Sequence, residues 1–162
     1  MGGDTRSLAD VSLTLRLARL EDIHEMVAIV DASFSDPWSE SSFAGYVSDA
    51  GAGRAIVTVA ESDGRVIGYS VMLFALPDAD LANIAIAPSE RRQGTGRLLL
   101  ERSLAAARSA GAQRVFLEVR ASNTAAIRMY ESASFAAFSL RRRYYRDPVE
   151  DAKVLRLDLS SR

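Results

Sequence analysis

The chain has 162 residues, a formal net charge of −1 at pH 7, 48 % hydrophobic residues, no cysteine and a single histidine. That length and apolar content suit one globular domain, and no stretch reaches the roughly 18 apolar residues of a membrane-spanning helix. A sequence without cysteine excludes disulfides, Cys-ligated metals and a covalent Cys acyl-enzyme. His24 alone leaves little for a zinc site or a Ser-His-Asp triad, and the near-neutral charge gives no global field that favours nucleic acid.

Hydrophobic periodicity predicts a single α/β domain with the element order β-α-α-β-β-β-α-β-α-β-β. Residues 1–12 are rich in Gly, Asp, Ser and Thr and lack the apolar core of a secretion signal. We therefore expect a flexible tail there, a folded domain over 13–160 and a cytoplasmic protein. Strands are expected at 13–17, 54–60, 65–76, a segment ending near 86, 113–120, 135–145 and 153–159, and helices at 21–33, a short segment to 47, 97–110 and 123–132.

Turns and helix ends are marked by small, polar and Gly or Pro residues, which cap helices or permit tight turns. The candidates are Ser39 or Ser41 and Ser122 as N-caps, Gly111 as a C-cap, and turns at 62–64 and 77–80. Pro37 and Trp38 lie in the turn between the first two helices. Trp38 either packs into the core or forms a wall for a ligand, since aromatic residues on loops are often functional.

The stretch from Asn83 to Leu100 is predicted to be a strand, a turn and then a helix. Ile84 and Ile86 alternate with small residues, as in a strand covered on both faces, and Pro88 ends the strand. Glycines then let the backbone turn tightly and approach a ligand. The first N–H groups of the following helix have no partner inside it, so they favour an anion such as a phosphate. The alternative is a tight turn with nothing bound.

Two familiar glycine loops do not match this turn. A Walker loop ends in Gly-Lys-Ser/Thr, which Arg97 does not supply, and a dinucleotide fingerprint needs a third glycine where Leu99 stands. The pattern that fits is Arg91-x-x-Gly94-x-Gly96. It resembles the pyrophosphate loop of the GNAT N-acetyltransferases, which hold acetyl-coenzyme A.

A second constellation places a carboxylate inside an apolar strand. Phe116, Glu118 and Arg120 are predicted to share one face, because side chains alternate along a strand. Glu118 is then either a structural ion-pair partner of Arg120 or of a neighbouring strand, or a general base in a cleft. Tyr130, on the following helix, either packs on the sheet or donates a proton to a leaving group.

The resemblance then becomes more specific. The stretches that carry it are Phe34-x-Asp36-Pro37-Trp38-Ser39-Glu40, Asn83-Ile84-Ala85-Ile86, Arg92-Gln93-Gly94-x-Gly96, Leu117-Glu118-Val119-Arg120-Ala121-Ser122-Asn123, Ala126-Ile127, Tyr130-Glu131-Ser132, Arg141-Arg142-x-Tyr144-Tyr145 and Glu150-Asp151-Ala152. Together they look like the ribosomal-protein-alanine N-acetyltransferases of the RimI type, over about residues 13–159. This family has the GNAT fold, a single α/β domain with a mixed, mostly antiparallel central sheet and helices on both faces.

The resemblance implies a role for each matching residue. The backbone of Ile84, Ala85 and Ile86 would hold the pantetheine arm of acetyl-CoA, and Asn123 would hydrogen-bond the cofactor near its reactive end. Glu118 would be the general base and Tyr130 the general acid. The pyrophosphate loop would comprise Arg91, Arg92, Gln93, Gly94, Thr95, Gly96 and Arg97. The flanks of the incoming peptide would be Pro37, Trp38, Tyr144 and Tyr145.

The implied reaction is direct transfer of acetyl to the α-amine of a protein, in particular the N-terminal alanine of a small-subunit ribosomal protein. An α-amine has a pKa of about 7.7–8.0 and must lose a proton before it attacks the thioester, which a carboxylate can accept. No protein nucleophile and no metal are required. We expect acetyl-CoA and a protein N-terminus as partners, no membrane, no direct contact with nucleic acid, and a monomer.

The chain departs from the family pattern at one place, and three alternatives to the implied function remain open. Where the family has Leu-Gly before the last Phe of its motif, this chain has Ala133 and Ser134, and a residue at that helix end often has positive φ. The acceptor could instead be a lysine side chain or a small amine, or the chain could bind acyl-CoA without catalysis. Arg141 to Arg143 and Arg146, among tyrosines, could form a nucleic-acid patch.

Overall fold

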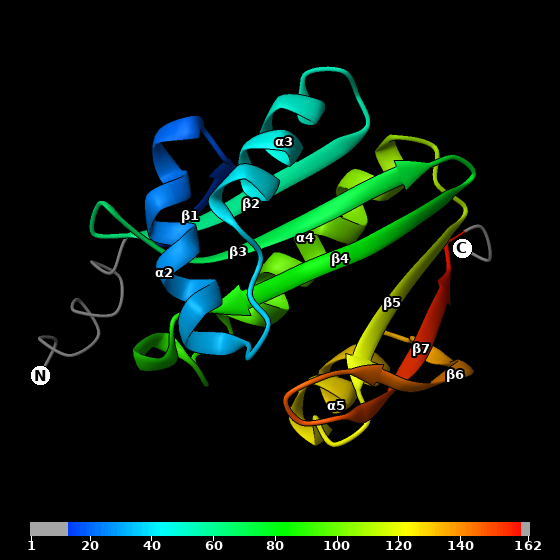
Figure 1. Cartoon of the computed structure of the whole chain (residues 1–162). Coiled ribbons are helices and arrows are strands. Elements are labelled where there is room, and N and C mark those ends of the chain that lie inside the picture. The colour runs from blue at the N-terminus through cyan, green and yellow to red at the C-terminus, as the bar shows by residue number, and fades with distance from the viewer. Residues whose placement is uncertain (1–12, 160–162) are drawn as a thin grey trace, which may run out of the picture.

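The computed structural model describes residues 13–159, so the predicted tail at 1–12 lies outside the described residues. The helices and strands follow the predicted order (Figure 1). The strands are β1 (Leu13–Leu17), β2 (Ala55–Ser62), β3 (Arg65–Ala75), β4 (Asp78–Ile86), β5 (Arg114–Arg120), β6 (Ala136–Tyr145) and β7 (Glu150–Asp158). The helices are α2 (Ile23–Ser33), α3 (Glu40–Ala50), α4 (Thr95–Ser109) and α5 (Thr124–Ser132), with 3₁₀ turns η1 (Leu20–Asp22) and η2 (Pro88–Glu90).

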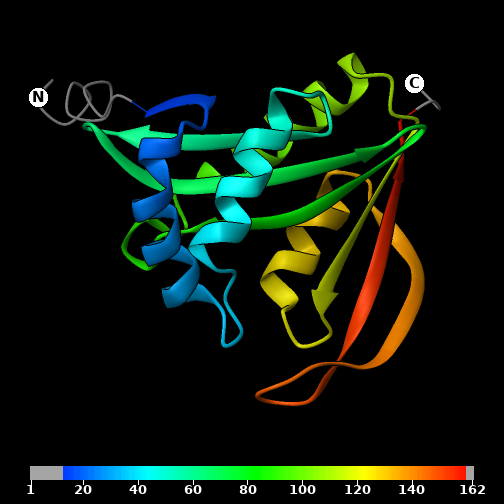
Figure 2. The same ribbon diagram turned by 45° about the horizontal axis from the view of Figure 1, so that its top comes forward.

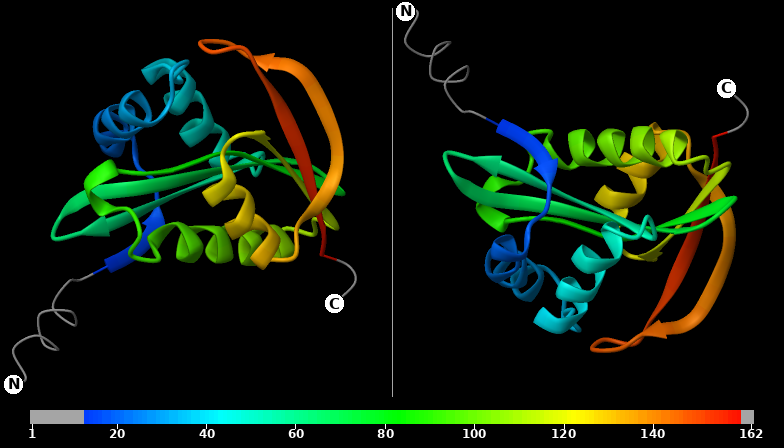
Figure 3. Two further views of the ribbon diagram at one scale, coloured as in Figure 1. Left: turned by 90° about the horizontal axis from the view of Figure 1, so that it is seen from below. Right: turned by 90° about the horizontal axis from the view of Figure 1, so that it is seen from above.

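The seven strands form one sheet in the order β1-β2-β3-β4-β5-β7-β6. The β4–β5 pair is parallel and the others are antiparallel. Helices α2 and α3 cover one face, and α4 and α5 cover the other (Figure 3). The predicted α/β class, with a mixed, mostly antiparallel sheet and helices on both faces, is therefore confirmed. No helix among residues 13–159 is long and apolar enough to cross a membrane.

Each face of the sheet carries its own core, because side chains alternate across the strands. On the α2/α3 face, Met26, Val30 and Phe43 pack against Tyr69 and Val71, all of them fully buried or nearly so. The opposite face packs α4 and α5 against the sheet through Leu100, Leu104, Ala107, Ile127, Tyr130, Leu81, Leu117, Val119 and Leu155. Alternation along β5 thus places Leu117 and Val119 on the α4/α5 face and Glu118 on the α2/α3 face.

The structure corrects several local predictions. The N-cap of α5 is Asn123 rather than Ser122, because the Asn123 Oδ1 accepts the Ala126 N–H at 3.2 Å. The turn expected at 77–80 is shorter, since β4 already begins at Asp78 and pairs with Ala75. Strand β7 starts three residues before the predicted Lys153, where Glu150 pairs with Tyr145. The predicted cap at Ser39 is confirmed, as its hydroxyl accepts the Ser42 N–H.

The start of α2 is fixed by a buried carboxylate that the periodicity did not reveal. Asp22 is 4 % exposed and accepts hydrogen bonds from the Arg16 guanidinium at 2.8 and 2.9 Å and from the Arg19 N–H at 2.7 Å. The Arg16 hydrogen bond holds the pKa of Asp22 below its ordinary value. These bonds account for the 3₁₀ turn that precedes α2 and join that helix to β1.

The departure at Ser134 leads to a stability prediction. Ser134 follows α5 with a φ of 79°, in the left-handed region that favours glycine. We expect Ser134→Gly to raise the free energy of unfolding by about 0.5–1 kcal/mol, with a rise in Tm of roughly 1–4 °C. Ser48→Gly, an exposed serine inside α3, is the matched control and should lower stability by about 0.5 kcal/mol. Equal melting shifts of the same sign in both variants would contradict this account of Ser134.

Candidate active site

The site begins where β4 and β5 separate. Their pairing is confined to Asp78, Ala79 and Asp80 opposite 114–116, and among residues 13–159 no strand pairing joins 81–86 to 117–120. A bulge at Ala82 adds to the bend, because Leu81 pairs with Met72 while Asn83 pairs with Val71. Figure 1 shows β4 and β5 starting side by side and ending far apart. The facing backbone edges are thus available to hydrogen-bond an extended ligand.

The predicted pyrophosphate loop leads from the end of β4 into α4. Gly94 is the N-cap of α4 with a φ of 84°, and no side chain caps the helix. Arg92 also has positive φ, 64°. The N–H groups of the first turn of this 15-residue helix therefore lack a side-chain acceptor at the N-cap, and the helix dipole adds positive potential there. A Cβ added at Gly94 would meet no atom within 4 Å, so the space beside that backbone is open.

Two arginines of this loop are held by the protein itself. Arg91 donates from Nε to the Ile86 carbonyl at 3.0 Å and from Nη2 to the Ser33 hydroxyl at 2.9 Å. Arg97 donates to Glu101 at 3.1 Å and to the Ser132 hydroxyl at 2.8 Å. Arg91 therefore fastens the loop to β4 and α2, and the backbone N–H groups at the start of α4 remain available to an anion.

Glu118 is half-buried on β5, and its partner lies on another strand. Its carboxylate forms an ion pair with the Arg141 Nε of β6 and accepts a hydrogen bond from the Tyr144 hydroxyl, which raises the pKa of Tyr144. Neither predicted ion-pair partner is found: Arg120 does not pair with Glu118, and Arg141 lies on β6, which β7 separates from β5. Arg120 is engaged instead with Glu150 and with backbone carbonyls of the hairpin, which lie within reach at the end of β5.

A second carboxylate lies near Glu118. Asp80 is opposite Phe116 in the β4–β5 register, on the same face as Glu118. Burial and then the Glu118 charge raise the pKa of Asp80, and Arg141 partly offsets this. The α2/α3 face of the splayed strands therefore carries two carboxylates with Arg141 close to both. Such a face attracts a cation such as an ammonium group.

Tyr130 lies on the other side of the sheet. It is 6 % exposed, belongs to the α4/α5 core and packs edge-to-face on Phe135 with ring centroids 5.8 Å apart. Burial, with a smaller effect of Tyr145, raises the pKa of the phenol, so it keeps its proton at neutral pH. Among the described residues, the Tyr130 hydroxyl makes no hydrogen bond. No fully buried side-chain nitrogen or oxygen atom in that part of the chain lacks a hydrogen-bond partner, so the Tyr130 oxygen is not fully buried. The oxygen is consequently open to solvent or to a ligand.

The structure brings some of the predicted acceptor-binding residues close to Glu118. Tyr144 contacts Glu118 directly, and its ring packs on Tyr145 with centroids 5.1 Å apart. Trp38 is half-buried and packs on Tyr46 at 5.0 Å, while Pro37 is exposed. Figures 2 and 3 show the tip of the β6–β7 hairpin on the same side of the sheet as the α2–α3 turn.

The residues predicted to bind the cofactor on β4 and at Asn123 still have backbone or side-chain groups available for a ligand. Ile84, Ala85 and Ile86 lie on the part of β4 that has left β5, while their other edge pairs with β3. The Asn123 side-chain oxygen Oδ1 caps α5, and the side-chain N–H₂ group remains as a donor for a ligand. Their contact with a cofactor stays a prediction.

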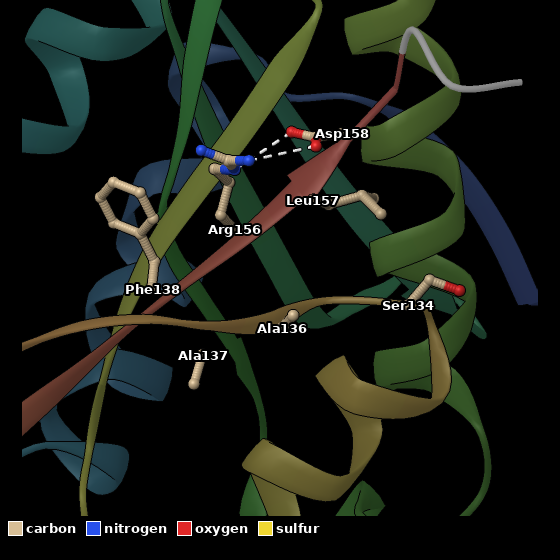
Figure 4. Close-up of a pocket in the computed structure, with 7 residues that line it drawn as sticks. All are labelled: Ser134, Ala136, Ala137, Phe138, Arg156, Leu157 and Asp158. Carbon is tan, nitrogen blue, oxygen red and sulfur yellow. Dashed lines mark hydrogen bonds and ion pairs between the residues drawn. The ribbon is translucent and has the colours of Figure 1, made fainter.

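A separate surface hollow of about 530 Å³ lies between the start of β6 and the end of β7. Figure 4 shows Arg156 beside it, paired with Asp158, on the rim that Phe138 also lines. The hollow is at the opposite end of the β6–β7 hairpin from Tyr144 and Tyr145, and none of the predicted site residues lines it.

Three residues beside Glu118 and Arg120 are not predicted from the sequence to belong to the active site: Asp80, Arg141 and Glu150. Arg141 and Glu150 lie in stretches that resemble the RimI motifs. Their ion-pair partners, Glu118 and Arg120, are 23 and 30 residues away in the sequence. Asp80 was placed in a turn. The alternation of acidic and apolar residues in Asp78-Ala79-Asp80-Leu81 is the signal that could have placed Asp80 in a strand beside β5.

Comparison with known proteins agrees with this geometry. Residues 23–135 match the model of the acetyltransferase (GNAT) family. The chain is 36 % identical over 149 residues to the [ribosomal protein bS18]-alanine N-acetyltransferase of Escherichia coli K12, covering 91 % of this chain and 98 % of that protein. The crystal structure of the E. coli ribosomal-protein-S18-alanine N-acetyltransferase superposes with a TM-score of 0.83 at 34 % identity, covering 91 % and 94 % of the two chains.

The same fold is found with its cofactor bound. The structure of yncA from Salmonella typhimurium with acetyl-CoA has a TM-score of 0.81 at 19 % identity, covering 91 % of this chain and 94 % of that one. At that identity the likeness concerns the fold. The resemblance predicted from the sequence motifs is confirmed by the family match and by the E. coli relative, which corresponds to this chain across nearly its whole length. The chain therefore belongs to the acetyltransferase (GNAT) family.

Proposed function

We propose that this N-acetyltransferase moves the acetyl group of acetyl-CoA to the α-amine of a protein N-terminus, with the N-terminal alanine of ribosomal protein bS18 as its acceptor. The relationship to the E. coli bS18-alanine N-acetyltransferase supports the choice of acceptor. The observation that carries the chemistry is the placement of Glu118 and Tyr130 on opposite faces of the sheet, beside the strands that separate. An amine and a thioester sulfur approaching from opposite faces would each meet one of these groups.

The residues present fit acetyl-CoA as the acetyl donor. The uncapped start of α4 would take the pyrophosphate, and the free edge of β4 at 84–86 would hydrogen-bond the pantetheine amides. The cofactor would supply an activated thioester. Backbone N–H groups at the splayed edges would stabilise the charge that develops on the carbonyl oxygen.

Glu118 and Tyr130 would manage the two protons. At pH 7 most of the α-amine, with a pKa of about 7.7–8.0, is protonated, and Glu118 would take that proton directly or through a water molecule. Tyr130, kept protonated by burial, would give its proton to the departing sulfur. Because the Arg141 side chain is 58 % exposed, its ion pair with Glu118 is open to competition, and the incoming ammonium group can take its place.

Binding of acetyl-CoA is tested by Gly94→Val. A β-branched residue is strained at the φ of 84° and places methyl groups in the open space beside the helix N-terminus. We expect at least a tenfold rise in the Kd for acetyl-CoA, because the phosphate loses close approach to backbone N–H groups. The matched control is Gly111→Val, at the other end of α4, which has a φ of 95° and the same open space but no anion site. Calorimetry on the folded variants that gives Gly94→Val the affinity of the control would reject this placement.

The acceptor is tested in cells. Because the proposed acceptor is a ribosomal protein, we place the activity in the cytoplasm. Mass spectrometry of protein N-termini, with and without the gene for this chain, should show loss of acetylation at the N-terminal alanine of bS18. Loss of acetylation only at lysine side chains or at small amines would reject the proposed acceptor while leaving the acetyltransferase chemistry intact.

A further inference from the structure

The Arg120 guanidinium joins segments that are far apart in the sequence. Its Nη1 donates to the Pro148 carbonyl at 3.0 Å and to Glu150 at 3.2 Å. Its Nη2 donates to the Arg146 carbonyl at 2.9 Å and to the Ser35 hydroxyl at 3.2 Å. The same guanidinium lies 4.4 Å from the centroid of the Tyr145 ring, at a distance typical of cation–π contacts.

Glu150 extends this cluster to the turn before α5. One carboxylate oxygen pairs with Arg120, and the other accepts the Ser122 N–H at 2.6 Å. The Ser122 bonds and the Arg120 pair lower the pKa of Glu150, so the carboxylate is charged at neutral pH. Arg120 and Glu150 thus connect the end of β5, the β5–α5 turn, the β6–β7 hairpin and the α2–α3 turn.

Two of these segments carry the aromatic residues predicted to flank the acceptor. Ser35 comes three residues before Trp38 on the α2–α3 turn, and Tyr145 is on the hairpin directly under Arg120. Within the described part of the chain, no other hydrogen bond or ion pair joins residues 34–39 to β5, β6 or β7. The one hydrogen bond that links the two flanks in the described residues is therefore made by the Arg120 guanidinium.

We infer that Arg120 is a positioning residue for the acceptor: by holding Ser35 on one side and the hairpin on the other, it sets the width of the site that receives the protein N-terminus. This inference rests on the proposed function. The planar guanidinium has five N–H donors in fixed directions, which is what simultaneous contact with Ser35, Glu150 and two carbonyls requires. A lysine ammonium keeps the charge but cannot span these acceptors.

The kinetic test compares Arg120→Lys with the parent on a peptide that begins with alanine. The KM for the peptide should rise about tenfold, the effect of one or two lost charge-assisted hydrogen bonds, with kcat and the Kd for acetyl-CoA changed less than threefold. Ser35→Ala should raise the same KM by a smaller factor, about threefold, and add nothing to Arg120→Lys in the double variant. The matched control is Arg114→Lys, on the same face of β5 and paired with Asp78, which should leave the peptide KM unchanged.

A second readout does not need catalysis. Trp38 is the only tryptophan of the chain, so its fluorescence reports the α2–α3 turn alone. Acrylamide should quench Trp38 more strongly in Arg120→Lys and in Ser35→Ala than in the parent or in Arg114→Lys, because the turn is no longer held against β5. If Arg120→Lys fails to fold in a thermal melt, Ser35→Ala carries both measurements.

The outcomes separate the inference from the proposed function. A parent protein that does not acetylate peptide N-termini refutes the proposed function, and with it the acceptor role of Arg120. Unchanged Trp38 quenching shows that Arg120 does not hold the turn, whatever the activity. An unchanged peptide KM in an active protein overturns the inference even if quenching increases.

Discussion

Glu118→Gln is expected to leave the protein folded and to lower kcat/KM at pH 7 by about a hundredfold or more, the usual contribution of a general base. Glutamine keeps the shape of the side chain and can still accept a hydrogen bond from Tyr144, but it cannot take the proton of the α-ammonium. The lost rate should return in part as the pH rises, because solvent then deprotonates the amine, whose pKa is about 7.7–8.0. A pH–rate profile of the purified variant measures this recovery.

Arg141→Gln provides the matched control. This substitution removes the Glu118–Arg141 ion pair by replacing the arginine, and it keeps the Glu118 carboxylate. The side chains of Glu118 and Arg141 are 30 % and 58 % exposed, so each variant should lose no more than about 1 kcal/mol of stability. The two variants should therefore melt alike, while only Glu118→Gln loses turnover. A Glu118→Gln protein that turns over like the parent would show that Glu118 is a structural partner of β6 and not the base.

Tyr130→Phe is expected to lower kcat by roughly a hundredfold, with the affinity for acetyl-CoA changed less than twofold. The substitution removes only the hydroxyl. Because that hydroxyl makes no hydrogen bond among the described residues, its removal leaves no partner unsatisfied and the melting temperature should not fall. Single-turnover kinetics with saturating acetyl-CoA would measure the effect on chemistry.

Tyr69→Phe is the matched control and is expected to lower stability while leaving turnover nearly unchanged. Tyr69 is fully buried on the other face of the sheet and donates to the Asn83 side chain at 3.1 Å. Its loss should cost about 1 kcal/mol of stability and leave turnover within a few-fold of the parent. If Tyr130→Phe behaves like this control, with stability reduced and kcat intact, Tyr130 is a packing residue.

Local sequence signals were sufficient for much of this architecture. The strand-turn-helix at 83–100 follows from proline, glycine and apolar spacing, all of which act within a few residues. The shared face of Phe116, Glu118 and Arg120 follows from strand alternation alone. The positive φ at Ser134 was expected from its place at a helix end and is found. These features need no knowledge of distant segments.

Pairings between distant segments could not be predicted in the same way. Whether Glu118 meets Arg120 or Arg141 depends on the register of β5, β7 and β6, which the alternation of one strand does not fix. The contact from Arg120 to Ser35 spans 85 residues and depends on how the hairpin tip packs over the sheet. The bulge at Ala82, which helps to separate β4 from β5, has no signal in a run of small and apolar residues.

The central claim is transfer of acetyl to an α-amine, and one measurement tests it most directly. The purified protein is incubated with acetyl-CoA and a peptide that begins with alanine and contains one internal lysine, and tandem mass spectrometry locates the added acetyl group. We predict acetyl on the N-terminal nitrogen alone, and no reaction with the same peptide when its N-terminus is already blocked. Acetyl on the lysine side chain, or equal reaction of the blocked peptide, would contradict the claim.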